Sequence, residues 1–155
     1  MGSGKVFKCT SCGKEFMSMT GIGMGFSNEY QEIVSKIKNG EYGEDFKKLM
    51  NSKKGVVVDL ERNLYICKKC GNWTENYCFD FYVPKKKEDI EKVSQENFCV
   101  MPHELKDGYE LILKIEHSCD KCGSDMRKIE PDEECVLKCP DCGKELETSG
   151  WIDWD

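Results

Sequence analysis

Four copies of one short motif constrain this chain more than any other feature of its sequence. Each copy is a Cys-x-x-Cys-Gly unit, in which two residues separate the cysteines and a glycine follows the second one. Two intervening residues let a tight turn direct both sulfur atoms to one point, and the glycine permits the positive φ that such a turn needs. Four such units indicate metal binding much more strongly than one. The eight cysteines are Cys9, Cys12, Cys67, Cys70, Cys119, Cys122, Cys139 and Cys142.

The high cysteine count raises the question of disulfides, since the 155 residues include 11 cysteines. The N-terminus lacks the apolar core of a secretory signal. The longest aliphatic run is Val56–Val58, and we therefore expect no membrane span. We expect a cytoplasmic protein whose thiols bind metal rather than form disulfides. The remaining cysteines, Cys78, Cys99 and Cys135, are expected to be small buried apolar groups.

The metal that suits four thiolates best is zinc. Zn²⁺ accepts four cysteine sulfurs at about 2.3 Å and imposes little geometric preference of its own. Eight paired cysteines therefore predict two Zn²⁺ ions. Iron also fits a tetrahedral four-sulfur site, which leaves a rubredoxin-like iron electron carrier as an alternative. A thiol–disulfide couple is disfavoured, because it needs a helix N-terminus in a βαβ setting and these motifs lie among expected strands.

Charge is distributed unevenly along the sequence. Residues 1–87 carry 15 Lys or Arg against 10 Asp or Glu, a net charge of +5, and residues 88–155 carry 8 against 19, a net charge of −11. Each four-thiolate zinc site adds a further −2 relative to neutral thiols. A phosphate backbone would be repelled by the second half, so any contact with nucleic acid is expected in the first half.

The first half contains a helical pattern between its two motifs. Apolar residues at spacings of 3, 4 and 7 predict a helix that runs to Lys38, with Asn39-Gly40 ending it. Ser27 or Asn28 can cap this helix, with Gln31 completing a capping box. The apolar face consists of Tyr30, Ile33, Val34 and Ile37.

Shorter elements are expected around this helix and in the second half. We predict a second helix over 44–50 and strands over 55–60, 63–66 and 73–83. The second half is predicted to be almost entirely strand. Its expected strands are 109–116, 126–129, 134–138 and 145–151.

The later two motifs resemble a known family. The pattern Cys119-Asp-Lys-Cys122-Gly, followed by Cys139-Pro-Asp-Cys142-Gly, is similar to the zinc-ribbon group of the rubredoxin-like fold, which includes uncharacterised bacterial double zinc-ribbon proteins. Zinc ribbons are three-stranded β units with a structural zinc, so the resemblance implies that fold here. The resemblance covers about 40 residues of the second half and only the cysteine motifs of the first.

The occurrence of two motifs in each half predicts a division of the chain, and the resemblance implies a grouping of the ligands. We expect an α+β protein with two small zinc-ribbon modules, at 5–84 and 95–155, joined by a charged linker at 85–94. The first module carries the helical insertion, and the second is mostly β. Pairing of motifs across the halves, such as 9/12 with 119/122, stays open. The implied ligand sets are Cys9, Cys12, Cys67 and Cys70 for one ion and Cys119, Cys122, Cys139 and Cys142 for the other.

The expected function is non-enzymatic. A four-cysteine site has no open coordination position for a hydrolytic water. The chain is therefore predicted to be a zinc-stabilised interaction or adaptor protein. An alternative is a nucleic-acid-binding accessory protein that uses Lys68-Lys69 and Lys85–Lys87 beside aromatic residues.

Aromatic residues near the C-terminus are the first candidates for contact with a partner protein. Trp151 and Trp154 either close a small core or present exposed anchors, and aromatic anchors dominate interface energetics. His117 precedes Cys119 by two residues and is an alternative candidate ligand, although a packing role is the simpler interpretation.

Overall fold

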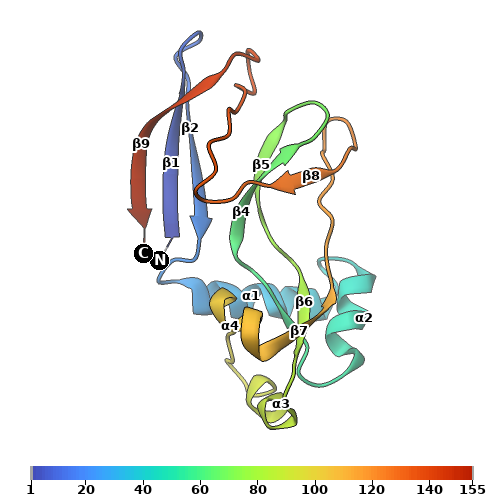
Figure 1. The fold of residues 1–155 in the computed structure, drawn as a ribbon. Helices are drawn as coiled ribbons and strands as arrows, with labels where there is room; N and C mark the ends of the chain where they lie inside the picture. Colours follow the sequence, from blue (N-terminus) through green and yellow to red (C-terminus); the bar gives the residue numbers. More distant parts are fainter. Residues whose placement is uncertain (1, 155) are drawn as a thin grey trace. The chain divides into compact units, whose positions relative to one another are not determined.

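A computed structural model describes residues 2–154 of the chain, and it confirms the predicted α+β class (Figure 1). Within these residues the chain forms four helices and two sheets whose strand pairs are antiparallel. The chain divides into two compact units. Unit 1 contains Met1–Gly23, Glu61–Tyr77 and Glu116–Asp155, and unit 2 contains Met24–Leu60 and Cys78–Ile115.

This division differs from the expected modules at 5–84 and 95–155. Both units are discontinuous in sequence, because the chain leaves unit 1 twice and returns to it twice. The expected linker at 85–94 lies within unit 2, and most of it forms the helix α3, Lys87–Val93. The cause is strand pairing, because strands late in the chain pair with hairpins formed by earlier segments.

Unit 1 contains two small three-stranded modules, of which module A comprises β1 (Gly2–Cys9), β2 (Glu15–Gly21) and β9 (Leu146–Trp154). β1 and β2 form a hairpin whose turn carries the first cysteine motif. β9 pairs with the other edge of β1, so Lys5 lies beside Ser18 on one side and Trp151 on the other.

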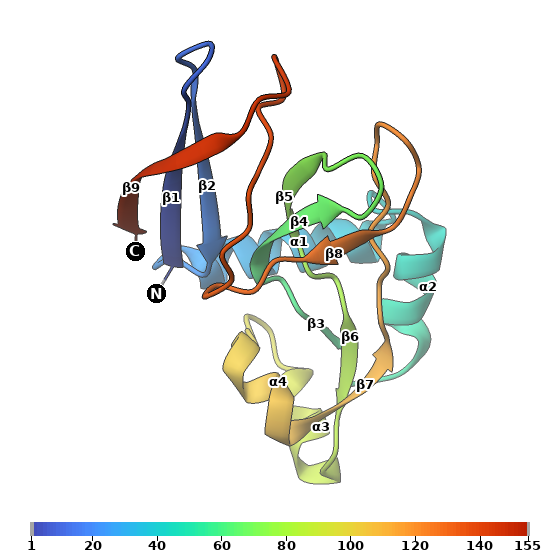
Figure 2. The ribbon, with the colours of Figure 1, turned by 45° about the horizontal axis from the view of Figure 1, so that its top comes forward.

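Module B repeats this arrangement with β4 (Arg62–Cys67), β5 (Trp73–Tyr77) and β8 (Met126–Lys128). β4 and β5 form a hairpin whose turn carries the second cysteine motif. β8 pairs with β4, and Cys67 lies beside Met126. In both modules, the strand that follows a late cysteine motif joins a hairpin that carries an early one. Figure 2 shows both hairpins with β8 and β9 beside them.

The modules are nested along the chain. The hairpin of module A comes first, the hairpin of module B second, the third strand of B next and the third strand of A last. The two hairpins join into one sheet, of order β5-β4-β2-β1-β9, through a single residue pair, Gly21 and Arg62.

Buried side chains of unit 1 gather beneath the first cysteine motif. Two motif cysteines, Cys9 and Cys139, belong to this cluster, so candidate ligands form part of the core. A second small cluster combines Cys67 and Cys119 with Tyr65 and Met126. The other buried members of the first cluster are Phe7, Leu64, Ile129, Leu137 and Leu146.

Unit 2 has a conventional helical core. α1 (Phe26–Asn39) buries the predicted face of Tyr30, Ile33, Val34 and Ile37, which confirms the periodicity argument. Gly40, at a φ of 90°, ends the helix as predicted, because glycine tolerates this left-handed conformation. The predicted capping box is wrong: the N-cap is Gly25, with no side-chain cap, and the Gln31 amide instead donates to the carbonyl oxygen of Phe98.

The other predicted elements of unit 2 differ from the structure in length. α2 runs over Glu44–Ser52, two residues beyond its predicted end, whereas the expected strand at 55–60 is reduced to β3, Val57–Val58. The expected strand at 73–83 is interrupted, because Phe79 adopts a φ of 61° that a strand cannot accommodate. Its second part is β6, Phe81–Pro84.

The second half contains helix as well as strand, although it was predicted to be almost entirely strand. Besides α3, α4 spans Pro102–Gly108 and leads directly into β7, Tyr109–Leu113. Pro102 occupies the first turn of α4, where proline is tolerated. β3, β6 and β7 form the three-stranded sheet of unit 2. No strand forms over the expected 134–138, which is irregular apart from a single bridge between Lys138 and Glu145.

Candidate metal centres

The four cysteine motifs adopt the same backbone conformation. In each, the glycine amide donates to the carbonyl oxygen of the first cysteine, at 2.8–3.2 Å. The amide of the first cysteine donates to the carbonyl oxygen five residues later, at 2.7–2.9 Å. The motif glycines have φ values between 71° and 75°, which explains why glycine occupies this position four times. They are Gly13, Gly71, Gly123 and Gly143.

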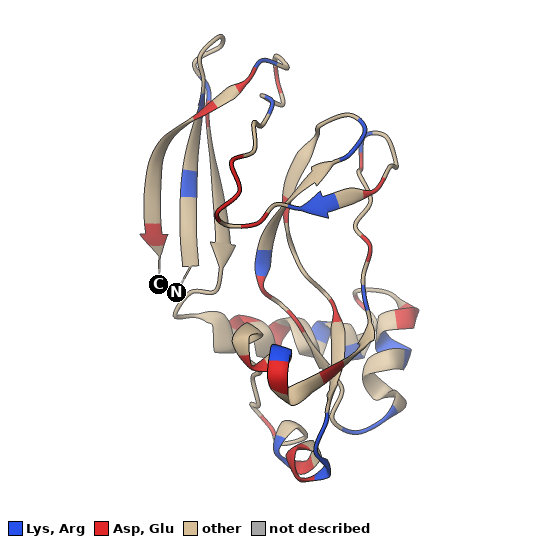
Figure 3. Cartoon of the chain, in the orientation of Figure 1, with Lys and Arg blue, Asp and Glu red and all other residues tan. Residues whose placement is uncertain are grey.

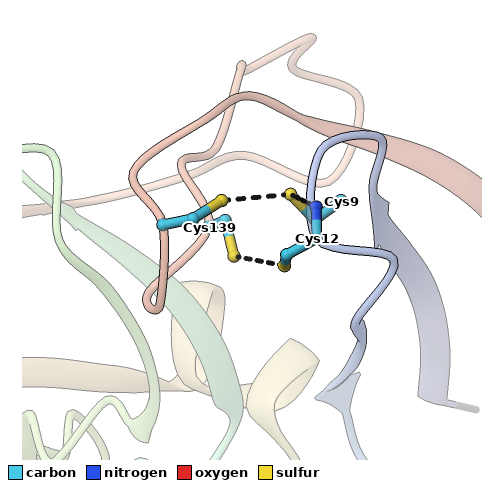
Figure 4. A group of neighbouring side chains, drawn as sticks. Cys9, Cys12 and Cys139 are labelled. Carbon is cyan, nitrogen blue, oxygen red and sulfur yellow. Dashed lines mark hydrogen bonds between the residues drawn. The ribbon is translucent and has the colours of Figure 1, made fainter.

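The structure groups the eight cysteines into two sets of four. We call these cluster A, formed by Cys9, Cys12, Cys139 and Cys142, and cluster B, formed by Cys67, Cys70, Cys119 and Cys122. Within each cluster all four Sγ atoms lie within 4.8 Å of one another. Figure 4 shows Cys9 and Cys12, from the β1–β2 turn, directed toward Cys139 from the C-terminal segment.

This grouping corrects the ligand sets that the resemblance implied. The first motif does not pair with the second, nor the third with the fourth. Instead the first pairs with the fourth and the second with the third, all within unit 1. The reason is that β9 pairs with β1 and β8 with β4, which brings the motif before each late strand to the turn of the corresponding hairpin.

The sulfur spacing fits a metal ion better than disulfides. The Sγ atoms of Cys9 and Cys142 are 3.4 Å apart, and those of Cys12 and Cys139 are 3.7 Å apart. Cluster B has corresponding distances of 3.4 and 3.6 Å. A disulfide requires about 2.05 Å, whereas a tetrahedron with metal–sulfur bonds of about 2.3 Å has edges of about 3.8 Å. The two clusters therefore have the donor atoms and approximate spacing of four-thiolate metal sites.

In both clusters, buried and exposed cysteines alternate along the sequence. The first cysteine of every motif is buried and the second is exposed. In two motifs the backbone also donates to the buried sulfur: the Cys12 amide to Cys9 Sγ at 3.5 Å, and the Cys70 amide to Cys67 Sγ at 3.5 Å. Such N–H groups stabilise a thiolate, which is the form that binds metal.

One thiol in each cluster is held well below its ordinary pKa. The Cys12 amide is the largest of the influences that lower the pKa of Cys9, to about 6. The Ser124 hydroxyl contributes most to lowering the pKa of Cys122, also to about 6. Other thiols of the clusters are shifted in the opposite direction: burial raises the pKa of Cys70, and the neighbouring Cys9 thiol raises the pKa of Cys142, both to about 11. Within each cluster, one thiol therefore deprotonates more readily than another.

A polar contact ties together the two turns of each cluster. In cluster A, Lys14 Nζ lies 2.5 Å from a carboxylate oxygen of Asp141, which raises the pKa of Lys14. In cluster B, the Asn72 amide nitrogen lies 3.0 Å from a carboxylate oxygen of Asp120 and 3.7 Å from Cys119 Sγ. Lys14 and Asn72 both stand five residues after the first cysteine of their motif. The two residues are therefore equivalent in position, but their partners are not: Asp120 directly follows Cys119, whereas Asp141 lies two residues after Cys139.

Trp73 connects the two modules of unit 1. Its ring packs against Phe7 and Phe16 of module A, with ring centroids 5.8 and 6.2 Å apart. Its Nε1 donates to the carbonyl oxygen of Lys138, the residue before Cys139, at 2.8 Å. A side chain of module B thereby helps to fix a ligand-bearing segment of cluster A.

The remaining cysteines and His117 lie outside both clusters. Cys78, Cys99 and Cys135 are half-buried rather than fully buried, in partial agreement with the expectation. Burial and the carboxylate of Asp59 raise the pKa of Cys78 far above its usual range. His117 stacks on Tyr65, with ring centroids 4.1 Å apart, which corresponds to the simpler interpretation of this residue.

The two C-terminal tryptophans have different environments. Trp151 is 69% exposed, with Lys5 Nζ 4.8 Å from its ring centroid. Trp154 is half-buried and packs so closely on Gly2 and Gly23 that a Cβ atom at either glycine would lie within 2.5 Å of the indole. Trp151 therefore suits the expected contact role, whereas Trp154 closes one end of module A.

The lysines of the expected nucleic-acid contact belong to different units. Lys68 and Lys69 lie in unit 1, whereas Lys85–Lys87 lie in unit 2. Nucleic-acid binding through these residues stays a prediction.

No family model, curated protein or solved structure matches this chain. Among the described residues, none of the helices has the length and apolar character required to cross a membrane.

Proposed function

We propose that this chain is a zinc protein in which clusters A and B each hold one structural Zn²⁺ ion. The observation that carries the proposal is the spacing of four sulfur atoms, repeated in two clusters built from identical turns. Four thiolates complete the tetrahedral coordination of zinc and leave no open position for a reacting water. The role that follows is structural rather than catalytic.

The zinc-ribbon resemblance supports this proposal through module architecture. Each cluster joins a β-hairpin turn to a second turn that is followed by a third strand, as in a three-stranded zinc ribbon. The two ligand-bearing turns of each cluster are far apart in sequence, so a bound ion cross-links distant segments. We infer that the ions maintain unit 1 as a rigid platform for a partner protein.

Metal content per chain tests the zinc assignment. We expect about two Zn²⁺ ions per chain by elemental analysis and native mass spectrometry, with no visible chromophore. Protein loaded instead with iron, and coloured, would support rubredoxin-like electron transfer and overturn the structural role.

Paired substitutions test the nested ligand sets. Cys9→Ser and Cys139→Ser should each reduce the zinc content to about one ion, and their combination should not reduce it further, because both residues belong to cluster A. The matched combination of Cys9→Ser with Cys119→Ser should release both ions. Loss of both ions from the first combination would contradict the proposed sets.

A further inference from the structure

A groove in unit 1 is separate from the metal clusters. It consists of two adjoining hollows, of about 640 and 320 Å³, that share Lys5, Leu64, Ile129, Pro131, Asp132 and Trp151. One wall is the face of β2, β1 and β9, and the other is formed by β4 and the irregular segment 129–137. We call this feature the β1–β9 groove.

The larger hollow has an apolar floor and an exposed apolar edge. Phe7, Leu64 and Leu137 are buried at its base. Trp151 and Val136 also line it, and they are 69% and 61% exposed. Exposed large apolar side chains beside a hollow are typical of binding sites, because a ligand removes them from water.

Carboxylates dominate the polar part of the groove. Glu133 is bound to Arg127 through two short contacts, of 2.6 and 2.9 Å. Asp132 and Glu134 are exposed and have no ion pair within the described residues. Figure 3 shows acidic residues along the chain that connects β8 to β9. The groove therefore favours a ligand that carries positive charge.

Lys5 offsets only part of this acidic charge. Its Nζ donates to the carbonyl oxygen of Pro131 at 3.3 Å and lies over the Trp151 ring. The other cation in the groove, Lys128, is 3.8 Å from Glu61. With Glu61 paired to Lys128 and Glu133 to Arg127, the single charge of Lys5 stands against the carboxylates of Glu130, Asp132 and Glu134. The net charge of the groove is therefore negative.

A buried hydroxyl in the smaller hollow lacks a hydrogen-bond partner. Ser18 is 2% exposed and lines this hollow, and its Oγ atom has no partner among the described residues. Buried polar atoms are nearly always satisfied, so an orphan beside a hollow indicates a missing donor or acceptor. Ser3 and Thr20 line the same hollow, with their hydroxyl oxygens 3.3 Å apart. A polar ligand group can be received here.

From these observations we propose that the β1–β9 groove binds an extended segment of a partner protein in which apolar residues alternate with Lys or Arg. The apolar side chains would contact Trp151 and the apolar floor, the cationic ones would face Asp132 and Glu134, and a backbone amide or carbonyl would satisfy Ser18. This inference deepens the proposed role as an interaction platform and rests on it, because the groove requires folded unit 1.

The test uses full-length, zinc-loaded protein and three synthetic peptides of equal length with blocked termini. Leucine occupies alternate positions in all three, and the intervening positions are lysine, glutamine or glutamate. We expect the lysine peptide to bind at least about tenfold more tightly than the glutamine peptide in calorimetry. The glutamate peptide should not bind. Equal binding of all three peptides would overturn the proposal.

Matched charge reversals locate the binding. The double variant Asp132→Lys, Glu134→Lys should weaken the lysine peptide at least about tenfold. The control, Glu145→Lys with Glu147→Lys, makes the same charge change on exposed residues of unit 1 outside the groove, and should weaken it less than twofold. Equal weakening by both variants would mean that the attraction is general, and would contradict the assigned site.

A further variant and probe separate the possible failures. Trp151→Ala removes an exposed side chain and should weaken the peptide about tenfold while zinc content stays unchanged. Preferential binding of a single-stranded DNA oligonucleotide would overturn the proposed partner class. If the protein carries two zinc ions and no peptide binds, the groove inference fails alone. If it carries no zinc, the proposed function itself fails.

Discussion

Units 1 and 2 are stabilised by different means. Five of the six largest fully buried side chains lie in unit 2, and the sixth is Cys9, a member of cluster A. Unit 2 thus excludes water with aliphatic and aromatic side chains on helices and a small sheet. In unit 1, thiols occupy part of the core, and its two modules are joined in the sheet by one residue pair. The five in unit 2 are Phe81, Ile37, Leu60, Val58 and Val100.

This difference predicts which unit depends on metal for its stability. Small β modules bury too little apolar surface to be stable alone, and a structural ion compensates for that deficit. Unit 2 contains no four-cysteine cluster within its described residues and has a core of its own. We therefore propose that one chain combines a metal-dependent unit with a metal-independent one.

Removal of metal by a chelator should give the largest effect, and it tests whether the two units differ in metal dependence. A four-thiolate zinc site contributes apparent binding free energy of about 10–16 kcal/mol, much of it used in folding. Metal removal should abolish amide-hydrogen protection in β1 and β4 while α1 remains protected, as followed by hydrogen exchange. Simultaneous loss of protection in both units would show that they unfold together, and would contradict a metal dependence confined to unit 1.

Truncation of the unit 2 core should have the converse effect. Phe81→Ala removes a fully buried ring and should lower the free energy of unfolding of unit 2 by about 3–5 kcal/mol. Zinc content should stay at two ions. Leu113→Ala, on a side chain that is 40% exposed in the same sheet, serves as the matched control with a much smaller effect. Denaturant titration with elemental analysis measures both results.

Within unit 1, the contacts around the two clusters can be compared directly. Asn72→Ala removes a donor 3.7 Å from Cys119 Sγ, and we expect about a tenfold loss of zinc affinity in cluster B. Lys14→Ala, at the equivalent position of cluster A, removes an exposed ion pair and should change affinity less. Competition with a chromogenic chelator measures both zinc affinities. A larger loss for Lys14→Ala than for Asn72→Ala would contradict the greater importance of the Asn72 contact.

Trp73→Phe should give a smaller change. The ring contacts with Phe7 and Phe16 can persist, but the hydrogen bond to Lys138 is lost. Because this hydrogen bond is exposed to solvent, water can partly replace it at the carbonyl oxygen of Lys138. We therefore expect the free energy of unfolding of unit 1 to fall by about 1 kcal/mol. The control is Trp151→Phe, at an exposed ring without that bond. Equal effects would indicate that the hydrogen bond contributes nothing.

Thiol reactivity gives the smallest of these differences. Burial, followed by the nearby carboxylate of Asp59, raises the pKa of Cys78, so little of it is thiolate at pH 8. We expect iodoacetamide to modify Cys78 more slowly in the folded protein than in urea, with mass spectrometry assigning the site. The folded-state rate should rise about tenfold per pH unit through pH 9, since the reactive thiolate increases in that proportion. A plateau near pH 8 would contradict the raised pKa.

The sequence alone predicted the features that depend on local geometry. The apolar spacing of Tyr30, Ile33 and Ile37 predicted the buried face of α1, because a helix repeats every 3.6 residues. The repeated glycines predicted four equivalent turns, since a positive φ is a local requirement. The grouping of eight cysteines as candidate ligands followed from those turns.

Features that depend on distant pairing were decided by the tertiary structure. All four motifs have the same form, so nothing in Cys9-x-x-Cys12 specifies whether its partner is the motif at 67, 119 or 139. The choice is made where β9 pairs with β1 and β8 with β4, contacts between segments more than 50 residues apart. The β1–β9 groove likewise arises only when Lys5, Leu64 and Trp151 are brought together. Local spacing therefore determined which residues can bind metal, and strand pairing determined which of them share an ion.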